Sequence, residues 1–144
     1  MPLYQCASPI GLLTEHMKSE LAQAITDAHV AATGAPQEFV HVVFTAVPEG
    51  AAYSAGQLDT TLSLISGSIR TGRSIEVKQQ LVKTIVESWS QITGQPLAQV
   101  VAGVTEIEPE VIMEYGLFLP RPGDEAEWFS ANKDALHGIH GAGL

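Results

Sequence analysis

The chain has 144 residues, and its length and composition predict one globular domain over residues 1–144. A hydrophobic share of 45% and a charged share of 16% exclude disorder as the dominant state. The formal net charge is −9, from 7 basic and 16 acidic residues. Nucleic acids and anionic membranes both need a basic face, so we expect neither as a partner.

Cysteine content and hydropathy narrow the class of protein further. Cys6 is the only cysteine, which excludes an internal disulfide and a cysteine-rich zinc site. No apolar run reaches the roughly 18–20 residues of a membrane span. The start of the chain, Met1-Pro2-Leu3-Tyr4, lacks the charged region of a secretory signal. We therefore expect a cytoplasmic protein.

An internal repeat, at an offset of sixty residues, organises the chain. Residues 14–47 align without gaps over residues 74–107. In both copies an apolar stripe of helical spacing is followed by Thr-Gly-x-Pro and an apolar run of strand length. The glycine ends each helix, and the proline prevents the helix from resuming. Matching pairs are Lys18 and Lys78, Leu21 and Leu81, Ile25 and Ile85, Gly34 and Gly94, Pro36 and Pro96, Val40 and Val100, and Thr45 and Thr105.

Each copy predicts a strand, a helix and a second strand. In chain order the predicted elements are a strand at Leu3–Cys6, a helix with its stripe from Met17 to Ala32, a strand at Phe39–Phe44, a strand at Leu62–Ile69, a helix with its stripe from Val77 to Ile92, and a strand at Val100–Val104. A helix that joins parallel strands crosses over with a right hand. The fold class is therefore α/β (α+β), with two fused β-α-β units giving a four-stranded mixed sheet with two helices on one face.

The other face of this sheet needs a cover, because the strands carry apolar residues on both sides. The repeat halves span about 2–60 and 61–107 and leave a C-terminal arm, 108–144, that is rich in proline and glycine. This arm carries a short helix around Trp128-Phe129. Either the arm covers the bare face or other subunits do, and the second alternative makes the protein an oligomer.

Pro2 is the first residue that could carry chemistry. A Met before a small residue is commonly removed during synthesis, and removal of Met1 would leave Pro2 as a secondary amine at the N-terminus. The reference pKa of an α-amino group is about 7.7–8.0, and burial lowers it. Pro2 could then act as a general base at neutral pH, or as an acid if its pKa stays high. Alternatively, Pro2 only begins a strand, a position that proline tolerates.

The segment Arg70-Thr71-Gly72-Arg73-Ser74 holds two of the chain's three arginines, at the end of a predicted strand. Ser74 suits the N-cap of the next helix, and a helix N-terminus favours anions through its free N–H groups and its dipole. Arginine adds planar, bidentate recognition of a carboxylate. The alternative is a solvated loop, but the concentration of positive charge in an acidic chain favours a small-anion site.

The remaining candidates are titratable residues next to apolar positions. His29 lies at the margin of the first helical stripe, where either a packed histidine or a binding residue fits. Glu114 follows an apolar tripeptide and is either a surface residue or a carboxylate with a raised pKa that acts on a proton or a water. His41 alternates within an apolar strand and is interpreted as structural. His137 and His140 have helical spacing without a further ligand, so we expect no metal site.

Taken together, these residues resemble the tautomerase superfamily, whose members carry an amino-terminal proline and are built from β-α-β units. Several motifs in order are similar to those of the cis-3-chloroacrylic acid dehalogenase family. They are Ala24-Ile25-Thr26-Asp27-Ala28-His29, Arg70-x-Gly72-Arg73, Glu114-Tyr115-Gly116-x-Phe118-Leu119-Pro120-x-Pro122-Gly123 and Glu127-Trp128-Phe129. The likeness runs from Pro2 to about Phe129.

The resemblance implies a role for each matching residue. Pro2 would transfer the proton, Arg70 and Arg73 would bind the substrate carboxylate, and His29 would assist them. Glu114 would activate water in the dehalogenating members. The resemblance also implies a small-molecule carboxylate as substrate, no cofactor, and a homotrimer in which the sheets face inward and the arm reaches a neighbour.

One position departs from the family's pattern and bears on the activity. The family's dehalogenases have a tyrosine in the last repeat strand that helps Glu114 position water, and here that place is Gly103; Tyr53 or Tyr115 could substitute. Keto–enol tautomerisation needs only the proline amine and the anion clamp. We therefore expect a tautomerase acting on small 2-oxo or enol carboxylates. The alternatives are a hydrolytic dehalogenase or hydratase of 3-substituted acrylates, and a non-catalytic carboxylate-binding module.

Overall fold

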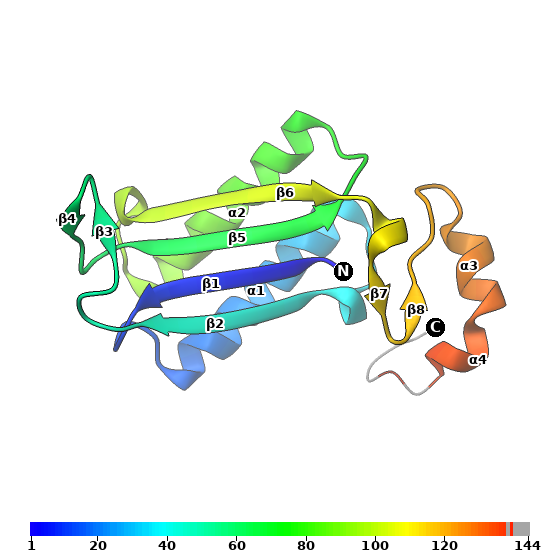
Figure 1. Cartoon of the computed structure of the whole chain (residues 1–144), viewed down its shortest axis with the longest axis horizontal. Coiled ribbons are helices and arrows are strands. Elements are labelled where there is room, and N and C mark those ends of the chain that lie inside the picture. The colour runs from blue at the N-terminus through cyan, green and yellow to red at the C-terminus, as the bar shows by residue number, and fades with distance from the viewer. Residues whose placement is uncertain (138, 140–144) are drawn as a thin grey trace.

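A sheet of four strands, in the order β2-β1-β5-β6, is the centre of the computed structural model, which describes residues 1–137 and 139 (Figure 1). Strands β1 (Leu3–Pro9) and β2 (His41–Val47) are parallel, and so are β5 (Ser63–Arg70) and β6 (Val100–Ile107). The two pairs meet through β1 and β5, which are antiparallel. The predicted mixed sheet is therefore confirmed.

Two long helices cover one face of this sheet, behind the strands in Figure 1. Helix α1 (Glu15–Thr33) connects β1 to β2, and α2 (Ile75–Thr93) connects β5 to β6. The hydroxyls of Thr14 and Ser74 each accept a hydrogen bond from the backbone N–H three residues on. Such caps contribute about 1 kcal/mol each, because they satisfy a donor that the first helical turn leaves free.

The helices end as the repeated Thr-Gly-x-Pro segments predict. Gly34 and Gly94 have φ angles of 72° and 76°, and their N–H groups donate at 2.8 Å to carbonyls four residues back. The prolines that follow lead into single 3-10 turns, η1 (Gln37–Phe39) and η2 (Leu97–Gln99). Strand β2 therefore begins at His41 and not at Phe39, because η1 takes up the residues between the proline and the strand.

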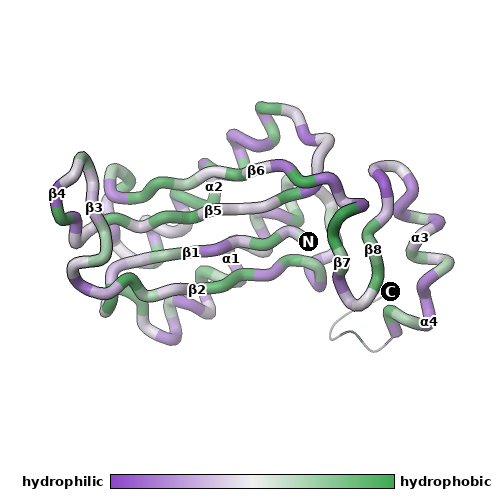
Figure 2. The backbone as a smooth tube through the Cα atoms, in the orientation of Figure 1, coloured by the Kyte–Doolittle hydropathy of each residue, from purple (hydrophilic) through white to green (hydrophobic). Residues whose placement is uncertain are grey.

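The main core lies between the helices and the sheet. Side chains along β5 alternate between buried and more exposed positions, as expected for a strand with one covered face. Figure 2 shows hydrophobic segments, in green, along the strands of the sheet. Each fully buried large apolar side chain stabilises the fold by roughly 1.5–3 kcal/mol. The core residues are Tyr4, Cys6, Leu21, Ile25, Ala28, Ile65, Ile69, Leu81, Ile85 and Trp89.

A short hairpin at one end of the sheet was not predicted. Strands β3 (Tyr53–Ser54) and β4 (Gln57–Leu58) pair antiparallel around Ala55 and Gly56, whose φ angles are 51° and 75°. Figure 1 shows this hairpin at the end of the sheet that lies opposite the N-terminus. Strands of two residues carry too little alternation to be recognised in a sequence.

The arm folds against the other end of the sheet, beside the N-terminus (Figure 1). Its elements are η3 (Pro109–Val111), β7 (Met113–Glu114), β8 (Leu117–Phe118), α3 (Glu125–Ala131) and α4 (Lys133–Leu136). Phe39, Leu119 and Leu136 form a second small core there, with Met1 and Trp128 packed against it. In the single chain, the arm therefore packs on its own protomer.

The second face of the sheet is open in the single chain. Val43, Leu64 and Val101 are 50%, 44% and 57% exposed. The described part of the arm lies beyond the end of the strands and does not cover this face. Of the two covers that the sequence left open, the arm over residues 108–137 is therefore excluded.

Candidate active site

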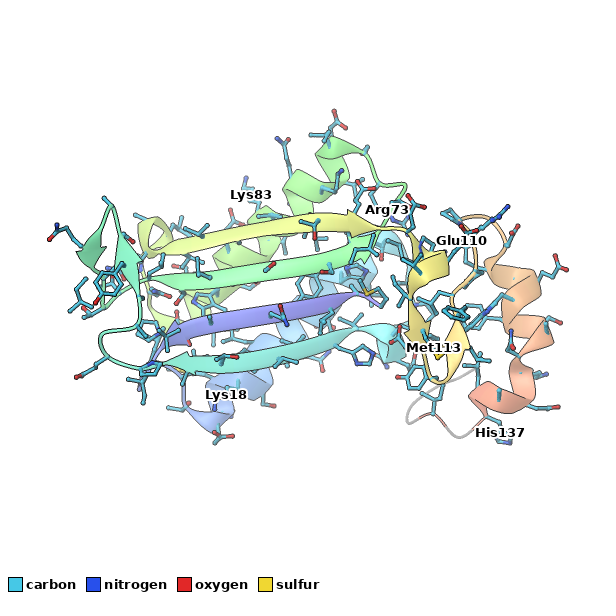
Figure 3. All side chains as sticks on the ribbon, viewed as in Figure 1. Lys18, Arg73, Lys83, Glu110, Met113 and His137 are labelled. Carbon is cyan, nitrogen blue, oxygen red and sulfur yellow. The ribbon has the colours of Figure 1, made fainter. Side chains whose placement is uncertain are left out.

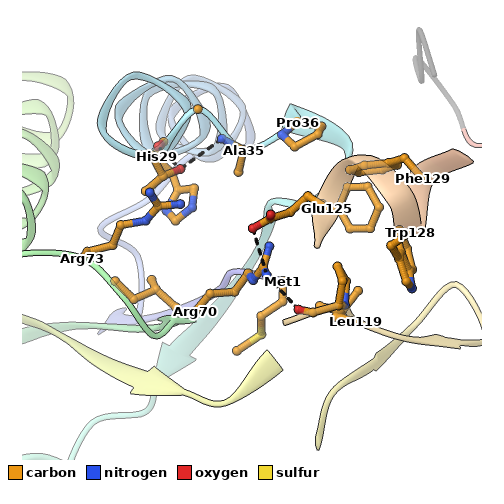
Figure 4. Close-up of a pocket in the computed structure, with 15 residues that line it drawn as sticks. Met1, His29, Ala35, Pro36, Arg70, Arg73, Leu119, Glu125, Trp128 and Phe129 are labelled. Carbon is orange, nitrogen blue, oxygen red and sulfur yellow. Dashed lines mark hydrogen bonds and ion pairs between the residues drawn. The ribbon is translucent and has the colours of Figure 1, made fainter. Parts of the chain in front are cut away.

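A pocket of about 390 Å³ lies where the arm meets the sheet (Figure 4). Its walls come from the C-terminal turn of α1, the end of β5 with the loop that follows, the segment after β8, and α3. His29, Arg70 and Arg73 line this pocket together, and Met1 lies at its side. The crossover topology thus joins residues that are about forty positions apart in the sequence.

Arg70 is the last residue of β5, and its guanidinium reaches the arm. Its Nη2 donates a hydrogen bond to the Pro120 carbonyl at 2.8 Å and lies 3.3 Å from Oε1 of Glu125. Its Nε is buried without a hydrogen-bond partner among residues 1–137 and 139. Arg70 therefore ties the arm to the sheet.

Arg73 is placed by a loop that Glu106 holds from β6. The Gly72 N–H donates to Oε2 of Glu106 at 3.0 Å, and Lys78 forms an ion pair with the same carboxylate. Gly72 has a φ angle of 108°, a conformation that a side chain would strain. Figure 3 shows Arg73 at the arm end of the sheet, far from Lys18 and Lys83, so two arginines dominate the positive charge of the pocket.

His29 is buried and electrically neutral. Burial is the main reason that its pKa falls to about 4, and the positive charges of Arg73 and of the N-terminus add to the effect. Its Nδ1 lies 2.8 Å from the Tyr4 hydroxyl. Burial raises the pKa of Tyr4 above its usual value, so the phenol keeps its proton.

This hydrogen bond determines which nitrogen of His29 carries the proton. The Tyr4 hydroxyl has no other partner within the described part of the chain, so it donates to Nδ1. A neutral ring with an accepting Nδ1 is protonated at Nε2. His29 therefore contributes an N–H donor, and no positive charge, to the pocket that Arg70 and Arg73 also line.

Pro2 and Glu114 are both next to Met1, although neither of them lines the pocket. The Pro2 side chain is fully buried, and its carbonyl accepts from the His41 N–H at 3.0 Å. The amine of Met1 contacts the Glu114 carboxylate and pairs with it when protonated. Burial, with a smaller effect of Arg70, lowers the pKa of this amine to about 5. While Met1 is attached, the nitrogen of Pro2 is an amide and cannot transfer a proton.

His41 has a contact that the sequence did not indicate. Its Nε2 pairs with the Glu114 carboxylate, at the N-terminal end of β2. The interpretation of His41 as a structural residue did not include this contact, which connects the start of β2 to the arm. The alternation along the strand had placed it correctly on a sheet face, but the arm that supplies Glu114 comes from a distant part of the chain.

The hydroxyl that could assist Glu114 is not supplied by this protomer. Gly103 lies on β6 and His41 on β2, at opposite edges of the sheet, about 15 Å apart. Tyr53 lies in the β3-β4 hairpin, at the far end of the sheet. Tyr115 is adjacent to Glu114, but its hydroxyl donates to the Glu38 carbonyl at 2.6 Å. Any tyrosine that acts with Glu114 would have to reorient or come from a neighbouring subunit.

The sequence missed the arm's contribution to the pocket. Phe39, Trp128 and Phe129 form an aromatic wall with ring centroids 5.1–6.4 Å apart, and the Trp128 Nε1–H donates to the Phe118 carbonyl at 2.9 Å. Glu125 adds a carboxylate to the wall. The Trp128-Phe129 pair was visible as a cluster, whereas nothing in the pattern distinguished Glu125 from the other acidic residues of the arm.

The second repeat half carries no such site. At the offset of sixty residues, Trp89 stands where the first half has His29, and Leu13 where the second half has Arg73. Trp89 is fully buried, and its Nε1–H donates to Gln95 at 2.8 Å. A hollow of about 390 Å³ does lie at the corresponding place, beside Thr93, Gly94 and Pro96, but none of its lining residues is charged, so only one half supplies a charged site.

The described part of the chain has neither a metal-binding cluster nor a membrane-spanning helix. Residues 1–137 and 139 bring together no group of three or more His, Cys, Asp or Glu that could hold a metal ion. Of the pair His137 and His140, the second lies outside the described residues. None of the described helices is long and apolar enough to cross a membrane.

Sequence comparison matches this arrangement to a known family. The model of a family described as "Putative oxalocrotonate tautomerase enzyme" matches residues 1–133. The chain is also similar to a "Probable tautomerase" of Streptococcus pneumoniae serotype 4 (strain ATCC BAA-334 / TIGR4). The two are 43% identical over 47 residues, which cover 33% of this chain and 78% of that protein.

Solved structures agree with the sequence match. N1, a member of the cis-3-chloroacrylic acid dehalogenase family, is 30% identical with a TM-score of 0.84, over 92% of this chain and 97% of N1. Native Ps01740 is 36% identical with a TM-score of 0.75, over 78% of this chain and 99% of that one. The chain therefore belongs to the tautomerase superfamily, and within it resembles the cis-3-chloroacrylic acid dehalogenase family.

Proposed function

We propose that the protein is a tautomerase whose base is the Pro2 amine, freed by removal of Met1. The observation that supports this most is the position of the chain start. Pro2 is buried directly behind Met1, which lines the same pocket as Arg70, Arg73 and His29. Loss of Met1 would open the space that Met1 fills and turn the amide nitrogen of Pro2 into an amine facing that space.

The surroundings of the chain start favour base chemistry. The pKa of the Met1 amine is lowered to about 5, first by burial and then by Arg70. The Pro2 amine would be buried beside the same arginine, so we expect its pKa to fall below the usual value of about 7.7–8.0. An amine with such a pKa is unprotonated at neutral pH and can accept a proton.

The reaction that fits is ketonisation of a 2-hydroxy-2-enoate. Arg70 and Arg73 would bind its carboxylate, and the Nε2–H of His29 would add a neutral hydrogen bond. Pro2 would take the proton of the enol O–H, so that the C2–O bond becomes a carbonyl and the C2=C3 electron pair becomes available at C3. Protonated Pro2 would then deliver its proton to C3, while the arginines stabilise the negative charge that develops on the enolate.

Ketonisation of phenylenolpyruvate by the wild type, Pro2→Ala and Pro9→Ala tests this proposal. Loss of the proton-transfer group should lower kcat by about 100-fold or more. Pro9 lies at the far end of β1, outside the pocket, so Pro9→Ala should stay within about twofold of the wild type. Equal rates for the wild type and Pro2→Ala would end the proposal. Intact mass spectrometry that shows Met1 retained would favour the non-catalytic carboxylate-binding module.

A dehalogenase or hydratase of 3-substituted acrylates is the second candidate, because the Glu114 carboxylate contacts the chain start. Protonated Pro2 would donate to C2, and a water that gives its proton to Glu114 would add to C3, after which the halohydrin loses chloride and a proton. This route needs a high pKa at Pro2, which the burial disfavours. Chloride release that is lost in Glu114→Gln and kept in Glu110→Gln would support it, and no release at high enzyme concentration would reject it.

We also propose a homotrimer assembled through the open sheet face. Val43, Leu64 and Val101 leave apolar surface exposed there, and fused 4-OT structures that share the fold are described as trimers. Leu64→Arg should yield monomers in sedimentation analysis. Leu97→Arg, an equally exposed leucine on η2, should not. A monomeric wild type would reject the assembly.

The cytoplasmic location stays a prediction that cell fractionation would check.

A further inference from the structure

Glu125 places a negative charge inside the pocket that is proposed to bind a carboxylate. It lies at the start of α3, and Figure 4 shows its side chain extending from the arm toward Arg70. Its Oε1 is 3.3 Å from Nη2 of Arg70, and its Oε2 accepts from the Gly123 N–H at 2.7 Å. Two separate contacts therefore hold this carboxylate on the wall of the pocket.

The carboxylate is ionised at neutral pH. Burial raises the pKa of the Glu125 carboxyl, but the backbone N–H groups of Glu125 and Gly123 and the charges of Arg70 and Arg73 outweigh it, so this pKa lies below its usual value. Its side chain is 41% exposed, so solvent reaches it and it can respond to a ligand. The ionised side chains that line the pocket are then Arg70, Arg73 and Glu125, because His29 is neutral.

This charge pattern limits how many negative charges a ligand can carry. Arg70 and Arg73 carry two positive charges and Glu125 carries one negative charge, so these side chains together have a net charge of +1. One carboxylate of a ligand can pair with this charge. A second carboxylate on the same ligand would find no further cation among the lining residues and would face Glu125. Like charges at such short range repel, and more strongly where the pocket wall displaces water.

We infer that Glu125 is a specificity-determining residue that makes the pocket prefer ligands with one carboxylate over ligands with two. The residue takes no part in proton transfer. Glu125 selects by charge, and it also competes with the ligand for Arg70. Its removal should therefore strengthen the binding of both ligand classes, and it should strengthen the binding of dianions more than that of monoanions. This inference rests on the proposed carboxylate site and deepens it.

A matched pair of ligands without an enol group, which the proposed tautomerase cannot ketonise, tests the inference by calorimetry. Isocrotonate and maleate share the cis-alkene skeleton and differ in one carboxylate. At a pH above both maleate pKa values, Glu125→Gln should bind isocrotonate about threefold and maleate about tenfold more tightly than the wild type. Glu125→Asp keeps the charge and should keep the preference. Glu127→Gln removes an exposed charge from the same helix, outside the pocket, and should change neither affinity.

The outcomes separate this inference from the proposed function. Equal changes in the two affinities, or no change, would overturn the role in specificity even if Pro2→Ala abolishes turnover. A selective gain for maleate in Glu125→Gln would support the inference even if the wild type ketonises nothing, because binding is measured without chemistry. In an active enzyme, the ratio of KM for 2-hydroxymuconate to KM for phenylenolpyruvate should fall about threefold in Glu125→Gln.

Discussion

The hydroxyl of Tyr4 lies 2.8 Å from Nδ1 of His29 and connects the sheet core to the candidate active site. Tyr4 belongs to β1 and is fully buried, while His29 belongs to α1 and lines the pocket. Their rings also meet edge to face, with centroids 5.8 Å apart. A residue of the hydrophobic core thereby determines the hydrogen-bonding state of a residue that lines the pocket.

Tyr4→Phe should weaken carboxylate binding without loss of the fold. Without the hydroxyl, Nδ1 of His29 is left unsatisfied, so the free energy of unfolding should fall by about 1–3 kcal/mol. The ring would also be free to carry its proton at Nδ1, so KM should rise about fivefold while kcat changes less. Nitrogen NMR of the labelled imidazole would report the tautomer directly.

Tyr53→Phe is the matched control, because Tyr53 is exposed in the β3-β4 hairpin. It should leave KM, stability and the imidazole spectrum as they are in the wild type. If His29 stays protonated at Nε2 in Tyr4→Phe, the positioning role of Tyr4 is wrong.

Gly67→Ala should disturb the hydrogen bond between Tyr4 and His29, because Gly67 packs against the Tyr4 ring. A Cβ at Gly67 would lie 2.6 Å from Cε1 of Tyr4 and 3.0 Å from Cγ1 of Val104, so the ring must move. We expect a loss of about 1–3 kcal/mol in stability and a raised KM. Gly103→Ala is the control on the next strand, because its Cβ would meet nothing within 4 Å. Equal urea midpoints for the two variants would contradict the tight fit of Tyr4 against Gly67.

Glu106→Gln should loosen the loop that carries Arg73. The carboxylate accepts from the Gly72 N–H and pairs with Lys78, and a neutral amide keeps only part of this pairing. The pKa of Glu106 is lowered, mainly by the Lys78 hydrogen bond and then by Gly72, which agrees with a carboxylate that is bound in its charged form. KM should rise about threefold with little change in kcat, since the loop positions binding groups only. Glu108→Gln, which breaks no such contact, should have an unchanged KM.

Acidification should destabilise the protein through His29. Its pKa is about 4 in the folded chain, against an ordinary value of 6.5 for histidine. Between these values the unfolded chain binds more protons than the folded chain. The free energy of unfolding therefore rises as the pH increases from about 4 to 6.5, and it falls again when the solution is acidified. The full difference should be about 2–3 kcal/mol. Urea titrations of His29→Gln should show a shallower pH dependence, whereas His16→Gln, on the exposed side of the same helix, should keep the wild-type slope.

The elements of the sheet and the long helices were predictable because their signals are local. Ser74 at an N-cap, Gly34 and Gly94 at C-caps and the period of the apolar stripes each depend on neighbouring residues alone. The prediction of secondary structure was incomplete where an element consists of only a few residues. The β3-β4 hairpin and the start of β2 at His41 depend on single turns, which leave little trace in hydropathy.

The candidate site was predictable only in part. Arg70 and Arg73 stood out because positive charge is scarce in this chain, and His29 through its place in a motif. Glu125 and the pairing of His41 with Glu114 carried no signal, because both depend on where the arm folds. The arm has no regular period, so its path follows from packing of Phe39, Leu119 and Leu136 and not from local propensity.

The amino-acid sequence alone determined the repeated β-α-β order, the helix boundaries and the residue types available for binding an anion, because period, caps and charge act over a few neighbouring residues. Tertiary structure decided which of those residues share one pocket, that Trp89 is buried where the first half has His29, and which nitrogen of His29 pairs with Tyr4. These properties depend on distances between segments far apart in the chain, and such distances are set only when the core and the arm have packed.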